Sequence, residues 1–240
     1  AVLTGALLVG DSVRGSLRQM TLDRLGRVDH VLSGPRFVRE QLAADIEVLP
    51  RFQERFNTLA PAIILSATVQ KTASGGGTTG GAGARAGGVQ LYGLTDAGWG
   101  LIDPSQPAPT GDQLTLNDRL ARQLGVAVGD QVTVQIELPS DIPRDTLLGK
   151  KDGNFVEWQA QVGAILPAES GPGRFGLLPN QQLPLNAFAA LAPVQEQLGL
   201  AAKEPSRRDP TRKEARVNAL LVSEKPARPS PDAPEAGTDL

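Results

Sequence analysis

Ser12 is the residue of this chain whose setting best suits catalysis. It closes the run Val9-Gly10-Asp11-Ser12, an apolar stretch that ends in Gly-Asp-Ser. A serine hydroxyl becomes a nucleophile when a base takes its proton, and a histidine oriented by a carboxylate is the usual base. The chain contains one histidine, His30, which directly follows Asp29. A hydrolase that uses Ser12 is therefore one hypothesis.

The same run resembles the opening motif of the GDS-type lipases and esterases, in which this serine is the nucleophile. In that family the histidine belongs to an Asp-x-x-His motif near the C-terminus. His30 has neither that spacing from Asp29 nor that position in the 240 residues. The pattern therefore favours a simpler interpretation, in which Asp11 and Ser12 cap a helix.

Metal and cofactor chemistry finds no support in the pattern. The chain has no cysteine, which excludes thiolate nucleophiles, disulfides and cysteine-ligated metals, and a single histidine leaves no second imidazole for a zinc or iron site. The glycine-rich stretch 75–88 contains no lysine and no Gly-Lys-Ser or Gly-Lys-Thr follows it, so it is not a P-loop. We therefore expect no catalytic, cofactor-binding or metal-binding residue, and no enzyme.

Charge argues against nucleic acid as a partner. The chain has 24 Lys and Arg residues against 26 Asp and Glu, a net charge of -2, so no overall field attracts a polyanion. Apolar residues make up 40% and aromatic residues 4%, which indicates a folded domain with an aliphatic core.

The elements expected around these residues follow from hydrophobic periodicity. Helical spacing predicts helices over 12–25, 37–46, 51–59, 117–124 and 194–198. Alternation and β-branched residues predict strands over 28–32, 62–70, 88–94, 111–116, 131–138, 155–166 and 217–222. This mixture predicts an α+β fold with mixed or antiparallel sheets and short helices. Trp99 and Trp158 are expected to pack in the core, Trp99 from a loop.

The segment 111–138 gives the clearest local prediction. Asn117 is a good N-cap, Leu120, Ala121 and Leu124 share one helical face, and Gly125 provides a C-terminal stop. A Gly129-Asp130 turn then leads into the next strand. The strand 63–70 is expected to pair antiparallel with 88–94 across a flexible glycine-rich loop, 74–88.

Three regions are expected along the chain. Residues 1–10 are apolar over about half the length of a membrane span, and we interpret them as the end of a first transmembrane helix or its stub. Residues 11–222 form the α+β domain, and residues 223–240 form a linker rich in Pro, Ala and Asp.

Taken together, these segments resemble the extracytoplasmic domain of an ABC-transporter permease of the FtsX-like or MacB-like family. The resemblance rests on Leu7 to Leu17, Leu116 to Val134, Val162 to Pro167, Leu185 to Pro193 and Arg216 to Val222. It implies a domain of two lobes between the first and second transmembrane helices. The glycine-rich loop and the segments 139–153 and 171–182 depart from the general family pattern.

The resemblance also implies a function and a location. In the family, such a domain is not catalytic and couples ATP hydrolysis by a separate subunit or domain to a periplasmic or lipoprotein partner or cargo. The parent protein lies in the inner membrane as a pair of copies, with this domain in the periplasm. Whether the cargo is a lipoprotein, a lipid, a peptide or a drug stays open, and two alternatives remain: a serine esterase that uses Ser12, and a free solute-binding module.

Overall fold

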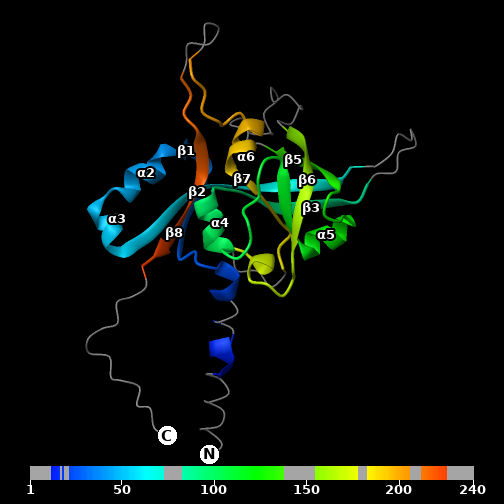
Figure 1. Cartoon of the computed structure of the whole chain (residues 1–240), viewed down its shortest axis with the longest axis horizontal. Coiled ribbons are helices and arrows are strands. Elements are labelled where there is room, and N and C mark those ends of the chain that lie inside the picture. The colour runs from blue at the N-terminus through cyan, green and yellow to red at the C-terminus, as the bar shows by residue number, and fades with distance from the viewer. Residues whose placement is uncertain are drawn as a thin grey trace, which may run out of the picture.

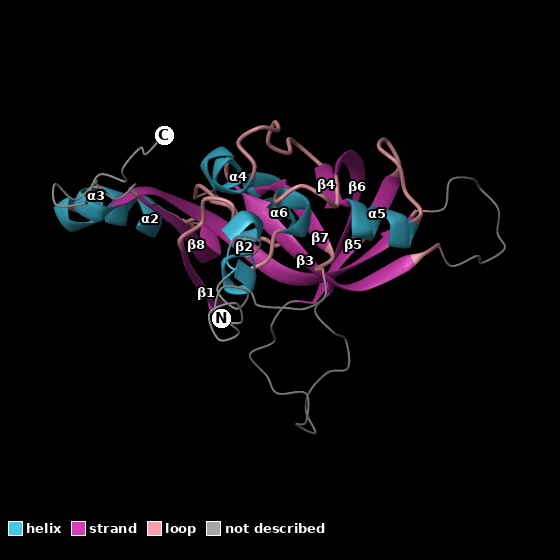
Figure 2. Cartoon of the chain, turned by 90° about the horizontal axis from the view of Figure 1, so that it is seen from below, coloured by secondary structure: helices cyan, strands magenta, loops and turns pink. Residues whose placement is uncertain are grey.

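One mixed sheet organises the described part of the chain. The computed structural model describes residues 12–16, 18, 22–72, 83–137, 155–177, 183–205 and 212–225. Eight strands form this sheet in the order β1-β8-β2-β3-β7-β4-β6-β5, with short helices around it (Figures 1 and 2). The strands are β1 His30–Arg39, β2 Phe56–Lys71, β3 Arg85–Leu94, β4 Gln113–Asn117, β5 Gln131–Glu137, β6 Phe155–Leu166, β7 Asn186–Ala190 and β8 Arg216–Glu224. The helices are α2 Gln41–Glu47, α3 Pro50–Arg55, α4 Asp96–Ile102, α5 Asp118–Leu124, α6 Leu191–Gln197 and the 3-10 helix η1 Pro172–Arg174. The predicted α+β class is confirmed.

The long strand β2 belongs to two parts of the sheet. Its first half pairs with β8, from Phe56↔Glu224 to Ala62↔Ala219, and its second half pairs with β5. The pairing with β5 closes a ring of strands, β2-β3-β7-β4-β6-β5. Within that ring β3–β7 and β4–β6 are parallel, and the other pairs are antiparallel. Strands β8 and β1 continue from the first half of β2 as an open sheet.

Two hydrophobic clusters occupy opposite faces of shared strands. Because successive side chains of a strand point to opposite faces, Leu91 joins the first cluster and Tyr92 the second. The same alternation separates Leu220 from Leu221. The second cluster is aromatic, with Tyr92 stacked on Phe188 at 5.2 Å between ring centroids. One sheet therefore serves both clusters, in place of two separate sheets.

The unit β4-α5-β5 matches its prediction closely. The Asn117 side chain accepts a hydrogen bond from the Leu120 N–H, which caps α5. Gly125 ends the helix at φ 60°, a left-handed conformation that glycine adopts without strain. Lys71 Nζ donates to Asp130 Oδ2 at 3.0 Å. That ion pair attaches the turn before β5 to the end of β2. The antiparallel pairing of β2 with β3 is confirmed as well.

The structure corrects the predicted helix over 37–46. Residues 37–39 end strand β1, and the helix α2 begins only at Gln41. Val38 pairs with Val217 of β8. The ladder with β8 therefore decides the conformation there, and the local helical spacing does not.

The predicted helix over 51–59 is also too long. Helix α3 ends at Arg55, and 56–61 already belongs to β2. Pro61 lies inside this strand although it has no N–H. On the β3 side the ladder begins only at Ala62↔Leu94, so no hydrogen bond from position 61 is needed on that side.

Two further predictions change. Trp99 is buried, as expected, but it lies in helix α4, capped by Thr95, and not in a loop. The glycine-rich loop is shorter than expected, because β3 begins at Arg85. Of the predicted loop 74–88, residues 74–82 lie outside the described residues, as do residues 1–10 and 226–240. Among the described helices, none is long and apolar enough to cross a membrane.

Candidate functional site at the junction of the first and last strands

The first and last strands of the sheet lie side by side. Strand β1 pairs antiparallel with β8, from His30↔Val222 to Ser33↔Ala219. Just before β1, the Asp29 N–H donates to the Val222 carbonyl at 2.9 Å. The helical segment before β1 and the end of β8 therefore leave the sheet on the same side (Figure 1).

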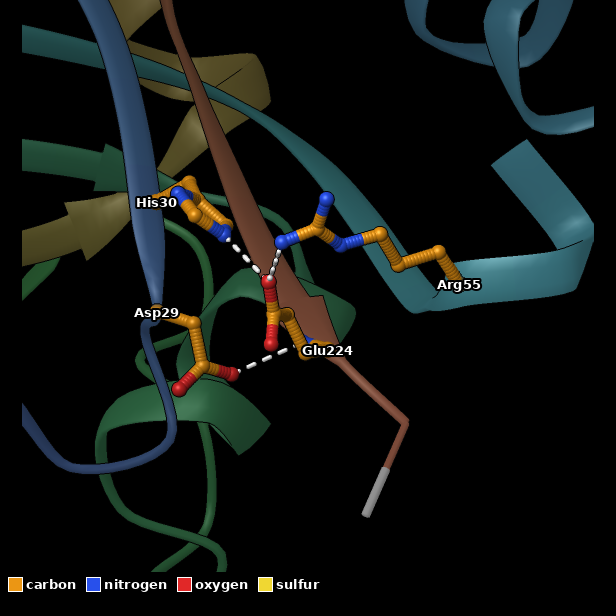
Figure 3. Close-up of polar contacts among 4 residues, drawn as sticks. All are labelled: Asp29, His30, Arg55 and Glu224. Atoms are coloured by element: carbon orange, nitrogen blue, oxygen red, sulfur yellow. Dashed lines mark hydrogen bonds and ion pairs between the residues drawn. The ribbon is translucent and has the colours of Figure 1, made fainter. Parts of the chain in front are cut away.

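Four polar residues cross-link this junction, and we call them the junction cluster: Asp29, His30, Arg55 and Glu224. Figure 3 shows His30 and Arg55 pointing toward the same carboxylate oxygen of Glu224. His30 Nε2 lies 2.8 Å from Glu224 Oε1, and Arg55 Nη2 donates to that oxygen at 3.1 Å. The Glu224 N–H donates to Asp29 Oδ2 at 2.7 Å. The cluster thus joins β1, the end of α3 and the end of β8.

The Phe56 ring packs against two members of the cluster, His30 and Arg55. The His30 ring meets the Phe56 ring edge-on, with centroids 5.7 Å apart. The Arg55 guanidinium carbon lies 5.6 Å from the centroid of the same ring. The Phe52 ring packs against the Phe56 ring, with centroids 5.1 Å apart. A cation over an aromatic face gains electrostatic stabilisation. The orientation of both donors is therefore set by packing as well as by Glu224.

The electrostatics of the cluster favour an ionised Glu224. Hydrogen bonds from His30 and then from Arg55 lower the pKa of the Glu224 carboxyl below its ordinary value, and the positive charge of Arg55 acts in the same direction. The side chains of His30 and Arg55 are 51% and 68% exposed. Solvent screens such a pair strongly, so the cluster fixes geometry more than it adds stability.

The cluster does not assemble the serine hydrolase that the sequence suggested. His30 faces Glu224, whereas Ser12 is exposed and makes no hydrogen bond to His30 among the described residues. Asp29 accepts a backbone N–H. The structure therefore brings Asp29 and His30 together with Glu224 and Arg55, and leaves Ser12 outside the cluster.

Two hollows lie on the described surface, and both are lined by charged residues. One of about 510 Å³ lies between Arg24 and Arg174, and one of about 570 Å³ lies between Glu40 and Lys213. Within the described ranges, no three His, Asp or Glu side chains are grouped to hold a metal ion. Neither hollow is the enclosed apolar pocket that a solute-binding module requires.

Sequence reasoning missed two members of the cluster. Arg55 was expected inside a longer helix, and Glu224 was assigned to a linker after the domain. The place of Asp29 and His30 within the predicted strand 28–32 was the one usable signal. The pairing of β1 with β8, which brings Glu224 to His30, joins residues 194 positions apart, and no local pattern reports it.

Comparison with known proteins gives a likeness in structure and none in sequence. No family model matches the chain, and no curated protein matches it significantly. The chain is similar to a solved structure described as the periplasmic region of MacB from Actinobacillus actinomycetemcomitans. The sequence identity is 9% and the TM-score 0.45, over 87% of this chain and 80% of that one.

Proposed function

We propose that this chain is the extracytoplasmic domain of an ABC-transporter permease, FtsX-like or MacB-like, and that it transmits movement without catalysis. One observation carries the proposal: β1 and β8 are neighbours, so both connections of the described fold leave it on one side. A domain inserted between two membrane helices needs its two connections close together, since both helices enter the same membrane.

The segment that resembles the family most specifically supports the same proposal. Its expected strand, helix, turn and strand fold as β4, α5 and β5, with Asn117 and Gly125 at the predicted cap positions. The apolar residues of this unit, among them Leu116, Leu120 and Val132, are buried and form part of the first hydrophobic cluster. The β4-α5-β5 unit thus has the local structure that the resemblance implied, and this supports the proposed function.

The junction cluster connects both ends of the described fold to the sheet, and we propose that it transmits the movement. Asp29 and Glu224 join the two connections to each other, and Arg55 joins them to α3 and to the start of β2. Because β2 runs from this junction into the strand ring, a displacement of either connection reaches the whole sheet. Movement of packed elements that behave as rigid bodies is a common form of such coupling.

The proposal includes the parts of the protein that lie outside the described fold. Residues 1–10 end the first transmembrane helix, the domain runs from residue 11 to the end of β8 at Glu224 instead of to 222, and the residues that follow are the linker. The parent protein lies in the inner membrane as a pair of copies, works with a separate ATP-binding subunit or domain, and meets a periplasmic or lipoprotein partner or cargo through this domain.

Cysteine labelling in cells that produce the parent protein tests the location. The chain has no cysteine, so an introduced one is the only thiol within these 240 residues. Val128 is 61% exposed, whereas Val134 is fully buried and serves as the matched control. A membrane-impermeant maleimide should label the Val128→Cys variant while the inner membrane is intact, and should not label Val134→Cys. Labelling of Val128→Cys only after that membrane is opened would overturn the proposal.

An ester hydrolysis assay and a capture experiment together test the absence of catalysis. Purified chain should not hydrolyse a p-nitrophenyl ester, and Ser12→Ala should change nothing, because the one histidine of the chain, His30, bonds to Glu224 and not to Ser12. In parallel, the immobilised chain is incubated with envelope proteins, and a captured partner is identified and then tested for binding in purified form. Ester turnover that Ser12→Ala abolishes would contradict the proposal and restore the hydrolase.

A further inference from the structure

The loop that follows β6 packs against the helical segment that precedes β1 (Figure 1). We call residues 167–175, which include η1, the η1 loop. Arg24 Nε donates to the Arg174 carbonyl at 3.2 Å. A Cβ at Gly171 would come closer to the Asp23 carbonyl oxygen than two unbonded atoms can approach. The two backbones therefore touch at Gly171, and a larger residue there would force one of them to move.

Hydrogen bonds within the η1 loop hold it in one shape. Arg174 Nε reaches back along the loop and donates to the Ala168 carbonyl at 2.6 Å. The Ser170 hydroxyl donates to the Pro167 carbonyl at 2.8 Å and accepts the Gly173 N–H at 3.1 Å. A network of satisfied hydrogen bonds makes a segment rigid. The η1 loop therefore cannot change its shape without breaking several of these bonds.

The far end of the η1 loop is fixed to the strand ring. The Gly173 carbonyl accepts the Asn117 Nδ2 at 3.1 Å, and the Phe175 carbonyl accepts the Asn186 Nδ2 at 2.6 Å. Asn117 caps α5, and Asn186 begins β7. The Phe175 side chain is fully buried, with its ring centroid 5.2 Å from that of Tyr92. The η1 loop thus joins the segment before β1 to the starts of α5 and β7.

The segment before β1 is also held by α4. The Arg27 N–H donates to the Leu101 carbonyl at 2.7 Å. Gly26 has φ 60°, and a Cβ on it would lie 2.6 Å from the same oxygen. Leu101 belongs to the second hydrophobic cluster, together with Val28 and Phe175. The segment therefore lies between α4 and the η1 loop, and both of these rest on one cluster.

We propose that the η1 loop is a rigid strut, which transmits a displacement of the segment before β1 to the starts of α5 and β7. Close-packed interiors have low compressibility and transmit strain, and the two ends of the loop are fixed as described above. This route is separate from the junction cluster, which joins β1, α3 and β8. The strut is a property of this fold, and it therefore stands or fails separately from the proposed function.

Amide hydrogen exchange of the whole chain, followed by NMR, tests the strut at both of its ends. The near end is reported by the N–H groups of Arg27 and Val28, which bond to Leu101 and Leu25. The far end is reported by the N–H groups of Leu120 and Asn186, which both bond to Asn117 Oδ1. The N–H of the fully buried Val134 in β5 serves as the reference for global unfolding.

The first variant is Arg174→Gln, which removes the bond to Ala168 and a second one, from Nη2 to the Glu169 carbonyl at 3.0 Å. Exchange should become at least about tenfold faster at both ends of the loop relative to Val134, the scale of losing one or two hydrogen bonds. The matched control is Arg36→Gln, since Arg36 is an exposed arginine of β1 outside the loop. This control should leave exchange at both ends unchanged.

The second variant is Gly171→Ala, which places a methyl group against the Asp23 carbonyl. It should give the same pattern as Arg174→Gln. Gly87→Ala is its control, because the nearest atom to the added Cβ lies at 4.0 Å there, and it should leave exchange at both ends unchanged. Faster exchange at one end only, an equal change at Val134, or no change in the two loop variants would overturn the proposal.

Discussion

Asn117 holds together three segments that are distant in sequence, and its replacement by alanine should be costly. Its Oδ1 accepts the N–H groups of Leu120 and Asn186, at 3.2 and 3.1 Å. Its Nδ2 donates to the carbonyls of Gly173 and Pro184, at 3.1 and 2.8 Å. The side chain thus forms hydrogen bonds with backbone groups at the start of α5, just before and at the start of β7, and in η1. The residue is 1% exposed.

The magnitude follows from the two hydrogen bonds that Oδ1 accepts. Loss of the N-cap by a change to alanine costs about 1 kcal/mol. The fully buried N–H of Asn186 would lose its acceptor as well, and a buried donor left unsatisfied costs about 1–3 kcal/mol. Asn117→Ala should therefore reduce the free energy of unfolding by about 3 kcal/mol in total. For a chain of this size that corresponds to a fall in Tm of about 6–12 °C.

The assay is urea unfolding followed by tryptophan fluorescence, since Trp99 and Trp158 are the two tryptophans. The matched control is Asp118→Ala, one residue further on. Asp118 forms an exposed ion pair with Arg122 at 2.9 Å, so its loss should cost at most about 1 kcal/mol. If Asn117→Ala and Asp118→Ala destabilised the chain equally, the reasoning from the buried hydrogen bonds would be refuted.

Asn117→Asp separates the accepted from the donated hydrogen bonds. The change keeps an acceptor for the two N–H groups but places a carboxylate oxygen against the carbonyls of Gly173 and Pro184. The pKa of the introduced carboxyl should therefore rise above its unfolded value. Its penalty is absent while the unfolded carboxyl is protonated, and it grows as pH rises from there toward the folded pKa. Urea midpoints of this variant should accordingly approach those of wild type at acid pH, and a constant gap would contradict the account.

Two further predictions concern the junction and the glycines. Hydrogen bonds from His30 and Arg55 lower the pKa of Glu224 below its ordinary value of 4.5, so its contribution to stability is complete above that pH and is lost as pH falls further. Urea midpoints measured from pH 6 to pH 3, about the window in which carboxylates titrate, should fall less steeply for Glu224→Gln than for wild type, and parallel curves would count against the cluster. Gly125→Ala should lower stability by about 1–2 kcal/mol because φ is 60° there. Gly100→Ala, inside α4 with no atom within 4 Å of the added Cβ, should raise stability by up to about 1 kcal/mol, and thermal unfolding of both variants checks the contrast.

The parts of the fold that sequence predicted well are those whose signals are local. Asn117, Gly125 and the apolar face between them specify α5 without reference to the rest of the chain, and the structure agrees. Helix α4 was missed because two glycines, Gly98 and Gly100, weaken its helical signal. The packing of Trp99 and Leu101 in the second cluster stabilises it instead, and that packing has no counterpart in local sequence.

The errors around β1 and β2 have a different physical origin. Residues 37–39 and 56–59 carry helical spacing, yet both segments pair with β8, which lies far along the chain. A ladder gained with a distant strand outweighs local propensity, which spans only a few tenths of a kcal/mol per residue. The junction cluster depends on the same pairing, which explains why His30 could be singled out but its partners Arg55 and Glu224 could not.

The position of β8 determines the order in which this domain can be completed. Strand β8 is the last strand in sequence, yet it lies between β1 and β2, which come from the first third of the chain. Until residues 216–224 have been synthesised, β1 and the first half of β2 have unpaired edges, which invite association with other chains. Folding that depends on pairing so distant is slow. In a chain that emerges from a ribosome or an export channel N-terminus first, β1 therefore stays unpaired until β8 has emerged. Chaperone binding to the edges of β1 and β2 would protect them from association until β8 inserts between them.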